Sequence, residues 1–301
     1  MLIALVGATA SGKTEIAIEM AQRFGAEIVG ADSRQVYRRL DIGSAKPTAA
    51  QRSAVPHHLI DVVEPDQHFD CARYRELALA AIDDIHRRGR RVLVVGGTGL
   101  YVSVLARGLF AGPPRDAALR ARLIAEENEA AGSLHRRLAA VDPVAAARLH
   151  ARDQVRLVRA LEVFEITGRP ISEWQAEHAR RGGQLAVHVI ALDLPRDELY
   201  ARIDARCREM VHAGLIEEVR ALLDSGLDPE LPSLRSPGYA EIGAHVRGLC
   251  SLGEALTQMS QATRRLAKRQ LTWMRGHPPA AYIVPTSDAV AAEIAKLWGG
   301  G

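Results

Sequence analysis

Cysteine, aromatic residues and long apolar runs are all scarce in this chain of 301 residues. The three cysteines form no Cys-x-x-Cys pair and have no paired histidines beside them, so the sequence encodes neither a disulfide framework nor a zinc site. No apolar run approaches the ~20 residues that a membrane span requires, and no basic leader precedes the first strand-like segment. We therefore expect a cytoplasmic protein without a membrane partner.

One segment of the chain lacks acidic residues altogether. The chain holds 39 Lys+Arg and 36 Asp+Glu, a net charge of +3, yet positions 255–287 contain neither Asp nor Glu. The same segment contains five basic residues: Arg264, Arg265, Lys268, Arg269 and Arg275. It therefore carries +5, and the remaining residues sum to −2. Such a local concentration of positive charge is typical of a surface that binds a nucleic acid backbone.

Short apolar runs alternate with amphipathic stretches over the first 110 residues, which predicts a parallel sheet with crossover helices. The expected strands are Leu2–Val6, Glu27–Gly30 and Val92–Val95. Helices are expected from about Lys13 to Phe24 and from about Cys71 to Arg88, each ended by a glycine. Hydrophobic residues make up 48% of the chain, which excludes disorder by composition. The fold class is thus α/β, with a doubly wound parallel sheet.

After Gly112 the sequence shows residues that begin and end helices in place of strand patterns. No strand is expected from 115 to about 182, where Asp116, Ser133, Asp142 and Asp153 are candidate helix caps. A strand pattern returns at His188–Leu194, and a long helical stretch follows from about 197 to 225. We predict a core formed by residues 1–114 and 183–301, with an all-helical domain inserted at 115–182. The alternative is that these helices pack on the core as ordinary layers.

The strongest motif lies between the first strand and the first helix. Its residues fit the phosphate loop G-x-x-x-x-G-K-[ST]: Gly7, Ala8, Thr9, Ala10, Ser11, Gly12, Lys13 and Thr14. The glycines let the backbone turn its N–H groups inward, and the positive end of the following helix adds to their attraction for an anion. Lys13 supplies a point charge, and the Thr14 hydroxyl can hold Mg²⁺. The loop therefore predicts a site for a di- or triphosphate.

An acidic strand end, which phosphate-loop ATPases use to organise Mg²⁺ and water, is missing here. The strand at 91–95 ends instead in Gly96-Gly97-Thr98. Asp32 follows the neighbouring strand pattern, in Ala31-Asp32-Ser33-Arg34-Gln35. Because the carboxyl ends of parallel strands meet at one edge of a doubly wound sheet, Asp32 and Thr98 are expected beside the bound phosphates.

With these motifs the sequence resembles the tRNA dimethylallyltransferases, the tRNA prenyltransferases of bacterial type. The matching segments run in order through nearly the whole chain: Gly7–Thr14, Ala31–Tyr37, Asp41–Pro47, Pro56–Asp61, Gly96–Tyr101, Arg156–Glu162 and Lys268–Trp273. The resemblance implies transfer of a dimethylallyl group from dimethylallyl diphosphate to the exocyclic amine of an adenosine 3′ of the tRNA anticodon, with release of diphosphate. A cytoplasmic monomer that uses Mg²⁺ is expected.

The resemblance also implies roles for individual residues. Asp32 would orient the adenine amine and take its proton, Thr98 would hydrogen-bond near the breaking bridge oxygen, and Arg206 would grip the diphosphate. Arg34 and Gln35 carry planar groups suited to reading or stacking an extruded base. Contacts with tRNA are expected from Asp32, Ser33, Arg34, Gln35, Arg120, Val155, Arg156, Leu157, Val158, Arg159, Arg235, Lys268, Arg269, Gln270, Thr272, Trp273 and Arg275.

The basic segment at 255–287 has helical periodicity. At 100° per residue, Arg264, Lys268 and Arg275 fall within about 40° of one another, and Arg265 and Arg269 lie next to them. Met259, Leu266, Trp273 and Met274 occupy the other side. We predict a helix packed on the core by its apolar side, with the basic side offered to RNA.

Three other functions compete with this interpretation. The first is a phosphate-loop kinase that uses ATP, against which the missing acidic strand end argues. The second is a prenyltransferase whose acceptor is a free adenine nucleotide, against which the basic helix argues. The third is a non-catalytic RNA-binding module, in which a phosphate loop beside Asp32 and Thr98 would have no purpose.

Overall fold

The computed structural model describes residues 1–181, 185–277 and 281–299, and its chain divides into two compact units. The catalytic unit consists of Met1–Ala106 and Leu185–Gly301, and the helical unit of Arg107–Gln184. The helical unit begins eight residues before the predicted insertion start at 115. The predicted boundary at 182–183 lies outside the described residues.

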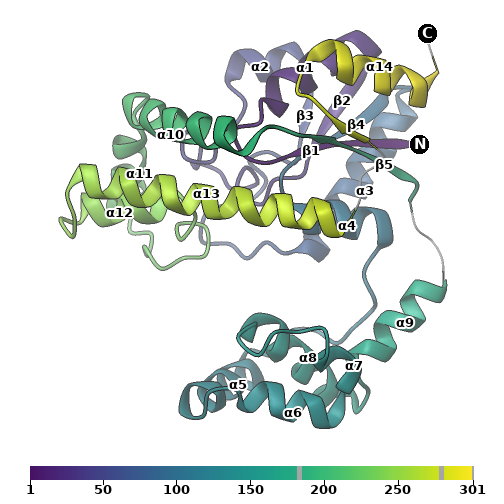
Figure 1. Cartoon of the computed structure of the whole chain (residues 1–301), viewed down its shortest axis with the longest axis vertical. Helices are drawn as coiled ribbons and strands as arrows, with labels where there is room; N and C mark the ends of the chain where they lie inside the picture. The colour runs from purple at the N-terminus through teal and green to yellow at the C-terminus, as the bar shows by residue number, and fades with distance from the viewer. Residues whose placement is uncertain (182–184, 278–280, 300–301) are drawn as a thin grey trace. The chain divides into compact units, whose positions relative to one another are not determined.

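A six-stranded parallel sheet forms the centre of the catalytic unit (Figure 1). The strand order is β3-β2-β4-β1-β5-β6, so β1 lies between β4 and β5. The predicted α/β fold with a doubly wound parallel sheet is confirmed. The described strands are β1 (Leu2–Gly7), β2 (Ala26–Gly30), β3 (His57–His58), β4 (Arg91–Gly96), β5 (Val187–Leu192) and β6 (Ala281–Ile283).

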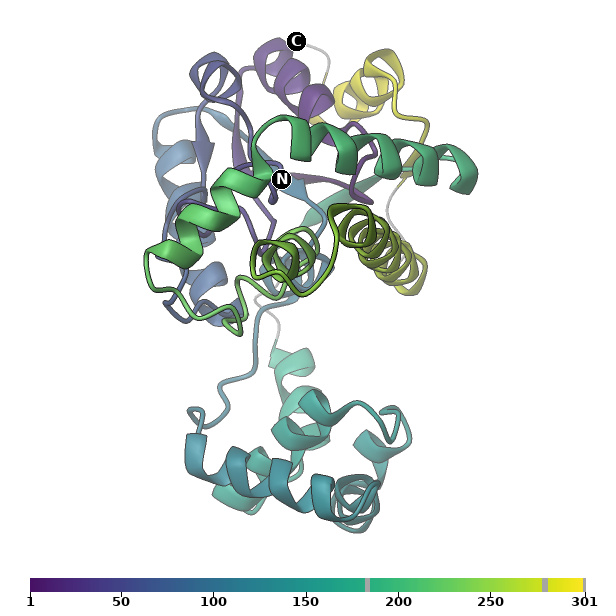
Figure 2. The ribbon, with the colours of Figure 1, turned by 90° about the vertical axis from the view of Figure 1, so that its left-hand side faces the viewer.

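Helices cover both faces of this sheet because its strands alternate apolar side chains between the two faces. Ile3 and Leu5 point into one hydrophobic cluster with α1 and α14, which lie side by side in Figure 2. The helices of the catalytic unit are α1 (Lys13–Phe24), α2 (Ala49–Ala54), α3 (Cys71–Arg87), α4 (Gly99–Arg107), α10 (Arg196–His212), α11 (Leu215–Asp224), α12 (Tyr239–Val246), α13 (Leu252–Gly276) and α14 (Ser287–Trp298). Across the described part of the chain, none of the helices has the length and apolar character to cross a membrane.

The predicted helical stretch at 197–225 is two helices. Gly214 has a φ of 102° and ends α10 before α11 begins, because residues with a side chain rarely adopt this left-handed backbone. The short edge strands β3 and β6 were not predicted, since runs of two or three residues carry no periodicity. α13 packs against both α10 and α12.

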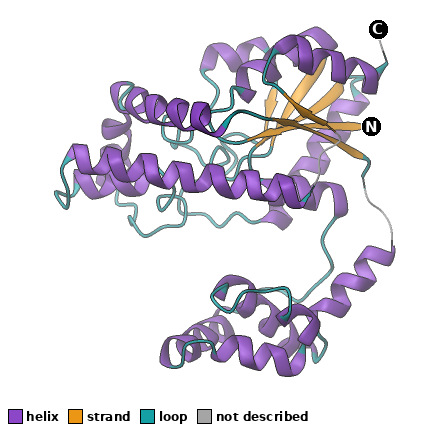
Figure 3. Cartoon of the chain, in the orientation of Figure 1, coloured by secondary structure: helices purple, strands orange, loops and turns teal. Residues whose placement is uncertain are grey.

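The helical unit contains helices and no strand among its described residues, as Figure 3 shows. Leu123, Leu138 and Leu157 are among the leucines that form its core. Asp116, Asp142 and Asp153 each cap a helix as predicted, but Gly132 rather than Ser133 precedes the second one. Its helices are α5 (Ala117–Glu129), α6 (Ser133–Val141), α7 (Pro143–Ala146), α8 (Gln154–Thr167) and α9 (Ile171–Arg181).

One buried carboxylate ties α5 to α8. Glu162 is fully buried and accepts hydrogen bonds from Arg120 at 2.7 Å, from Arg159 at 2.6 Å and from the Asp116 backbone at 2.9 Å. Burial by itself raises the pKa of Glu162, but the bonds from the two guanidinium groups and the backbone outweigh it and hold this pKa at about 2. Arg120 and Arg159 therefore have a structural role in this unit, and the tRNA contacts expected of them stay predictions.

Replacing Glu162 with glutamine is expected to destabilise the helical unit by about 3 kcal/mol, because two half-buried guanidinium groups lose their counter-charge. Hydrogen exchange of the α5 and α8 peptides in the full chain measures this loss. Glu173→Gln is the control, since its ion pair with Arg169 is exposed and contributes under about 1 kcal/mol. The folded pKa of Glu162 lies below its ordinary 4.5, so its stabilisation is complete above that pH and falls away as the pH drops towards 2. Equal protection in the two variants would contradict the structural role.

Candidate active site

The phosphate loop joins the end of β1 to the start of α1. Its backbone passes through left-handed conformations at Ala10, with φ 64°, and at Gly12, with φ 83°. This conformation is uncommon for a residue with a side chain such as Ala10, and such backbone is characteristic of ligand-binding loops. The turns place the loop at the positive N-terminal end of α1, where an anion is stabilised. The structure therefore puts the predicted motif in the strand–loop–helix setting that its chemistry needs.

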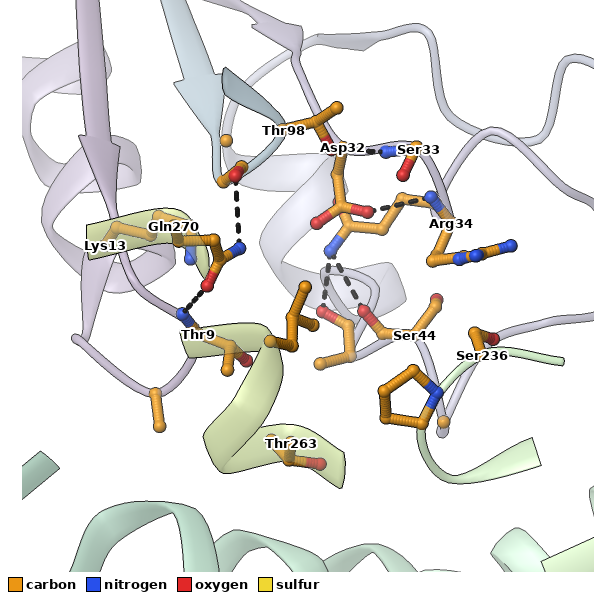
Figure 4. A pocket seen from close by; sticks show the side chains of 18 of the residues that line it. Thr9, Lys13, Asp32, Ser33, Arg34, Ser44, Thr98, Ser236, Thr263 and Gln270 are labelled. Carbon is orange, nitrogen blue, oxygen red and sulfur yellow. Dashed lines mark hydrogen bonds between the residues drawn. The ribbon is translucent and has the colours of Figure 1, made fainter. Parts of the chain in front are cut away.

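Strand order brings Asp32 and Thr98 to the same edge as this loop. β4 lies between β1 and β2, so the segments that follow these three strands are neighbours. The Ser33 N–H donates to Thr98 Oγ1 at 2.9 Å, and the Arg34 N–H donates to Asp32 Oδ1 at 2.8 Å (Figure 4). The Thr98 hydroxyl thus retains its own proton to donate, and Asp32 retains Oδ2 to accept.

A cavity of about 350 Å³ opens at this edge of the sheet. The predicted residues that line it are Thr9, Ala10, Lys13, Thr14, Asp32, Ser33, Arg34, Gln35, Thr98, Arg206, Arg269, Gln270 and Trp273. Sequence reasoning missed an apolar wall from α10 and α13, formed by Ile203, Cys207, Met210, Met259 and Leu266. The spacing of Ile203, Arg206, Cys207 and Met210 on one face of α10 was a signal for it.

Positive charge gathers at the phosphate-loop end of the cavity. Burial lowers the pKa of Lys13 to about 8; the nearby charge of Asp32 raises this pKa and that of Arg206 lowers it. Lys13 Nζ donates to the Ala8 carbonyl at 3.2 Å. Lys13 and Arg206 are therefore close enough to repel each other, and a bound anion would relieve that repulsion.

The side chains after Asp32 also hold neighbouring loops in place. Arg34 donates to the Pro232 carbonyl at 2.6 Å, and Gln35 Nε2 donates to the Ala45 carbonyl at 3.0 Å. Both residues line the cavity, as predicted, but these donors are already engaged. Arg235, a predicted tRNA contact, is exposed and lies 3.8 Å from Glu230. Lys46 is buried in ion pairs with Asp41 and Asp61, at 2.7 and 2.5 Å.

α13 presents its basic residues to solvent with one exception. Arg265, Lys268, Arg269 and Arg275 are exposed and make no ion pair among the described residues. Arg264 was placed on this face from helical periodicity, but its partly exposed side chain is engaged within the unit. Its guanidinium pairs with Asp204 and lies over the Tyr200 ring, so it fastens α13 to α10.

The other predicted tRNA contacts differ in their exposure to solvent. Leu157 and Val158 belong to the core of the helical unit, and the prediction was wrong for their side chains. Val155 and Arg156, at the start of α8, are exposed. Thr272 is exposed beside Lys268, to whose carbonyl it donates at 2.8 Å. The Trp273 indole N–H donates to Ser103 Oγ at 3.2 Å, so this end of the ring serves the packing of α13 on α4.

Comparison with known proteins finds one family along most of the chain. The family model for IPP transferase matches residues 35–277. The tRNA dimethylallyltransferase of Anaeromyxobacter sp. (strain Fw109-5) is 52% identical, with 96% of each chain covered. That of Geobacter metallireducens is 51% identical over 91% of this chain and 89% of the relative.

Solved structures agree with these sequence matches. A tRNA isopentenylpyrophosphate transferase from Bacillus halodurans is 38% identical with a TM-score of 0.73, covering 99% of this chain and 95% of that one. A eukaryotic dimethylallyltransferase described as acting on tRNA has a TM-score of 0.78 at 26% identity, covering 91% of this chain and 69% of that one. The predicted resemblance is confirmed: the chain belongs to the IPP transferase family, whose named members here are tRNA-modifying prenyltransferases.

Proposed function

We propose that this chain transfers a dimethylallyl group from dimethylallyl diphosphate to the exocyclic amine of an adenosine 3′ of the tRNA anticodon. The observation that carries the proposal is a single cavity that combines a phosphate loop, a carboxylate and an apolar wall. Lys13 and Arg206 supply charge for a diphosphate, while Ile203 and Met210 supply a surface for a hydrocarbon. The active form proposed here is a monomer.

The leaving group is stabilised at the phosphate loop. The loop N–H groups, Lys13 and Arg206 bind the diphosphate, and the Thr98 hydroxyl donates its proton in a hydrogen bond to the bridge oxygen. As the carbon–oxygen bond breaks, its electron pair passes to that oxygen, and charge develops where these donors already point. Water needs no activation in this reaction, so the absence of an acidic residue after β4 is consistent with it.

Asp32 orients the acceptor amine and takes its proton. One carboxylate oxygen is held by the Arg34 N–H, which leaves the other to accept a hydrogen bond from the adenine amine. As the nitrogen–carbon bond forms, the amine becomes acidic and its proton moves to Asp32. Because the amine must enter the cavity, the adenosine has to leave its stack, and a single-stranded loop permits this most easily.

Mg²⁺ fits the donors of this site. Thr14 lines the cavity, and the described residues contain no cluster of carboxylates, histidines or cysteines that would hold a metal alone. Mg²⁺ commonly keeps several waters and binds one or two protein oxygens together with substrate phosphates. We propose that the Thr14 hydroxyl and the diphosphate hold the ion, which would neutralise charge on the leaving group.

Transfer of label tests the activity directly. The purified chain is incubated with Mg²⁺ and radiolabelled dimethylallyl diphosphate, with tRNA or AMP as the acceptor. Label in tRNA, located by nuclease digestion next to the anticodon, is expected. Label only in AMP, or transfer of the γ-phosphoryl group of ATP with no prenyl transfer, would overturn the proposal.

Removing two charges from the exposed face of α13 is expected to weaken tRNA binding and flatten its salt dependence. Lys268→Gln with Arg275→Gln should reduce the slope of log K against log salt by about 1.4–1.8, since each phosphate contact contributes about 0.7–0.9. The matched control is Arg23→Gln with Arg90→Gln, which removes equal charge from exposed positions outside α13. Equal slopes in the two double variants would exclude α13 from the RNA interface.

A further inference from the structure

A single amide side chain joins the two loops that carry the proposed chemistry. Gln270 Oε1 accepts from the Thr9 N–H at 2.8 Å, and Gln270 Nε2 donates to the Gly97 carbonyl at 3.1 Å (Figure 4). Thr9 belongs to the phosphate loop after β1, and Gly97 precedes Thr98 in the loop after β4. Gln270 lies far from both in the sequence, on α13.

The Gln270 side chain, which bridges the two loops, leaves no room for a side chain at position 97. A Cβ atom built on Gly97 would lie 2.2 Å from Gln270 Nε2, so position 97 must be glycine while the amide is in place. One turn further along α13, Trp273 packs so closely on Gly99 that a Cβ there would lie 2.1 Å from the ring. α13 is thereby fixed against the loop after β4 on both sides of Thr98.

The Gln270 amide satisfies both loops at once. The Thr9 N–H requires an acceptor and the Gly97 carbonyl requires a donor, and a carboxylate or an aliphatic side chain supplies at most one of these. Both polar atoms of the Gln270 side chain form hydrogen bonds to these two loops. The side chain is thus directed into the unit, away from the exposed Lys268 and Arg269. The tRNA contact expected of Gln270 from the sequence stays a prediction.

We propose that Gln270 is a positioning residue for prenyl transfer, an inference that rests on the proposed function. It sets the distance between the phosphate loop, which holds the diphosphate, and the Thr98 hydroxyl, which donates to the bridge oxygen. Thr98 is held from its other side by the Ser33 N–H at 2.9 Å. Gln270 therefore acts through Thr98 and the loop backbone.

Gln270→Leu and Gln270→Glu test this role. The leucine removes both hydrogen bonds, and the glutamate keeps an acceptor for Thr9 but places a carboxylate oxygen against the Gly97 carbonyl. We expect kcat to fall about 100-fold in both, the size of effect that a displacement of about 1 Å produces. The tRNA Kd should stay within about threefold, because the exposed face of α13 is unchanged. Gln261→Leu is the matched control, since Gln261 is exposed on the same helix and should leave kcat unchanged.

A double-mutant cycle separates positioning from general loss of structure. If Gln270 acts through Thr98, Gln270→Leu should cost much less than 100-fold in a Thr98→Ala background, because coupled residues are not additive. Additive losses, an unchanged kcat in the single variants, or a loss confined to tRNA affinity would each overturn the proposal.

Hydrogen exchange gives a second measurement that does not depend on turnover. The Thr9 amide should exchange faster in Gln270→Leu than in the parent chain or in Gln261→Leu, because it loses its acceptor. An unchanged exchange rate would overturn the bridge. Failure of the parent chain to transfer a prenyl group would instead count against the proposed function, and the two failures are therefore distinct.

Discussion

Asp32→Asn is expected to lower the single-turnover rate of prenyl transfer by about 1,000-fold, the typical contribution of a positioned general base. Asparagine preserves the shape of the side chain and can still accept the hydrogen bond that the Arg34 N–H makes at 2.8 Å. What it loses is the oxygen that takes the proton from the adenine amine. The affinities for tRNA and for dimethylallyl diphosphate should change by less than about tenfold, because neither the α13 surface nor the phosphate loop is altered.

The pH of this experiment matters because Asp32 acts on a neighbour. The carboxylate raises the pKa of Lys13, so its removal lowers that pKa below about 8. Measurements at pH 6.5, below the parent pKa of about 8, favour protonated Lys13 and so reduce this second effect of the substitution. Asp66→Asn, at an exposed position of the same unit, is the control. A rate close to that of the parent would refute the proton-transfer role.

The phosphate loop, Asp32 and Thr98 could be predicted because each follows a strand. The motif lies between the strand Leu2–Val6 and a helix, and Asp32 and Thr98 each follow another strand. Together these positions identify one edge of a parallel sheet. The strand order β2-β4-β1 then places the three segments together. No long-range pairing had to be guessed, since parallel strands joined by crossover helices have their carboxyl ends at the same edge.

Partners that come from distant segments could not be predicted. Helical periodicity placed Arg264 on the basic face of α13, but it does not show that Asp204, sixty residues earlier, lies within reach. The same limit explains Arg120, whose partner Glu162 lies on another helix. Periodicity identifies a face, whereas the identity of the neighbouring element depends on tertiary packing.

Lys13→Met is expected to abolish measurable binding of dimethylallyl diphosphate while stabilising the ligand-free chain. Folding lowers the pKa of Lys13 from 10.5 to about 8, which means that the fold disfavours the charged side chain. Each pKa unit corresponds to about 1.4 kcal/mol, so we expect a gain of about 1–3 kcal/mol at pH 7, allowing for the lost hydrogen bond to Ala8. Methionine keeps the length of the stem and removes the charge.

The pH dependence of that gain identifies its origin. Between pH 8 and 10.5 the unfolded chain keeps the Lys13 proton and the folded chain releases it, so this group makes the parent more stable as the pH rises. The variant lacks the group, and its advantage over the parent should therefore shrink steadily from pH 8 upward. Taking the difference between the two proteins cancels the contributions of other titrating groups, such as Cys207 and the buried tyrosines. Urea unfolding at pH 7, 8 and 9 measures it, and an advantage that stayed constant would show that the stabilisation is not electrostatic.

The same titration governs binding in the parent chain. Diphosphate binds the protonated form of Lys13, so the affinity for dimethylallyl diphosphate should fall as the pH rises above about 8, and binding there should take up a proton. Isothermal titration in two buffers of different ionisation enthalpy measures this uptake directly. A parent affinity that is flat from pH 7 to 9 would mean that Lys13 does not supply the charge that holds the leaving group. Holding the charged Lys13 side chain thus costs electrostatic free energy in the ligand-free protein, and the binding of an anion offsets that cost.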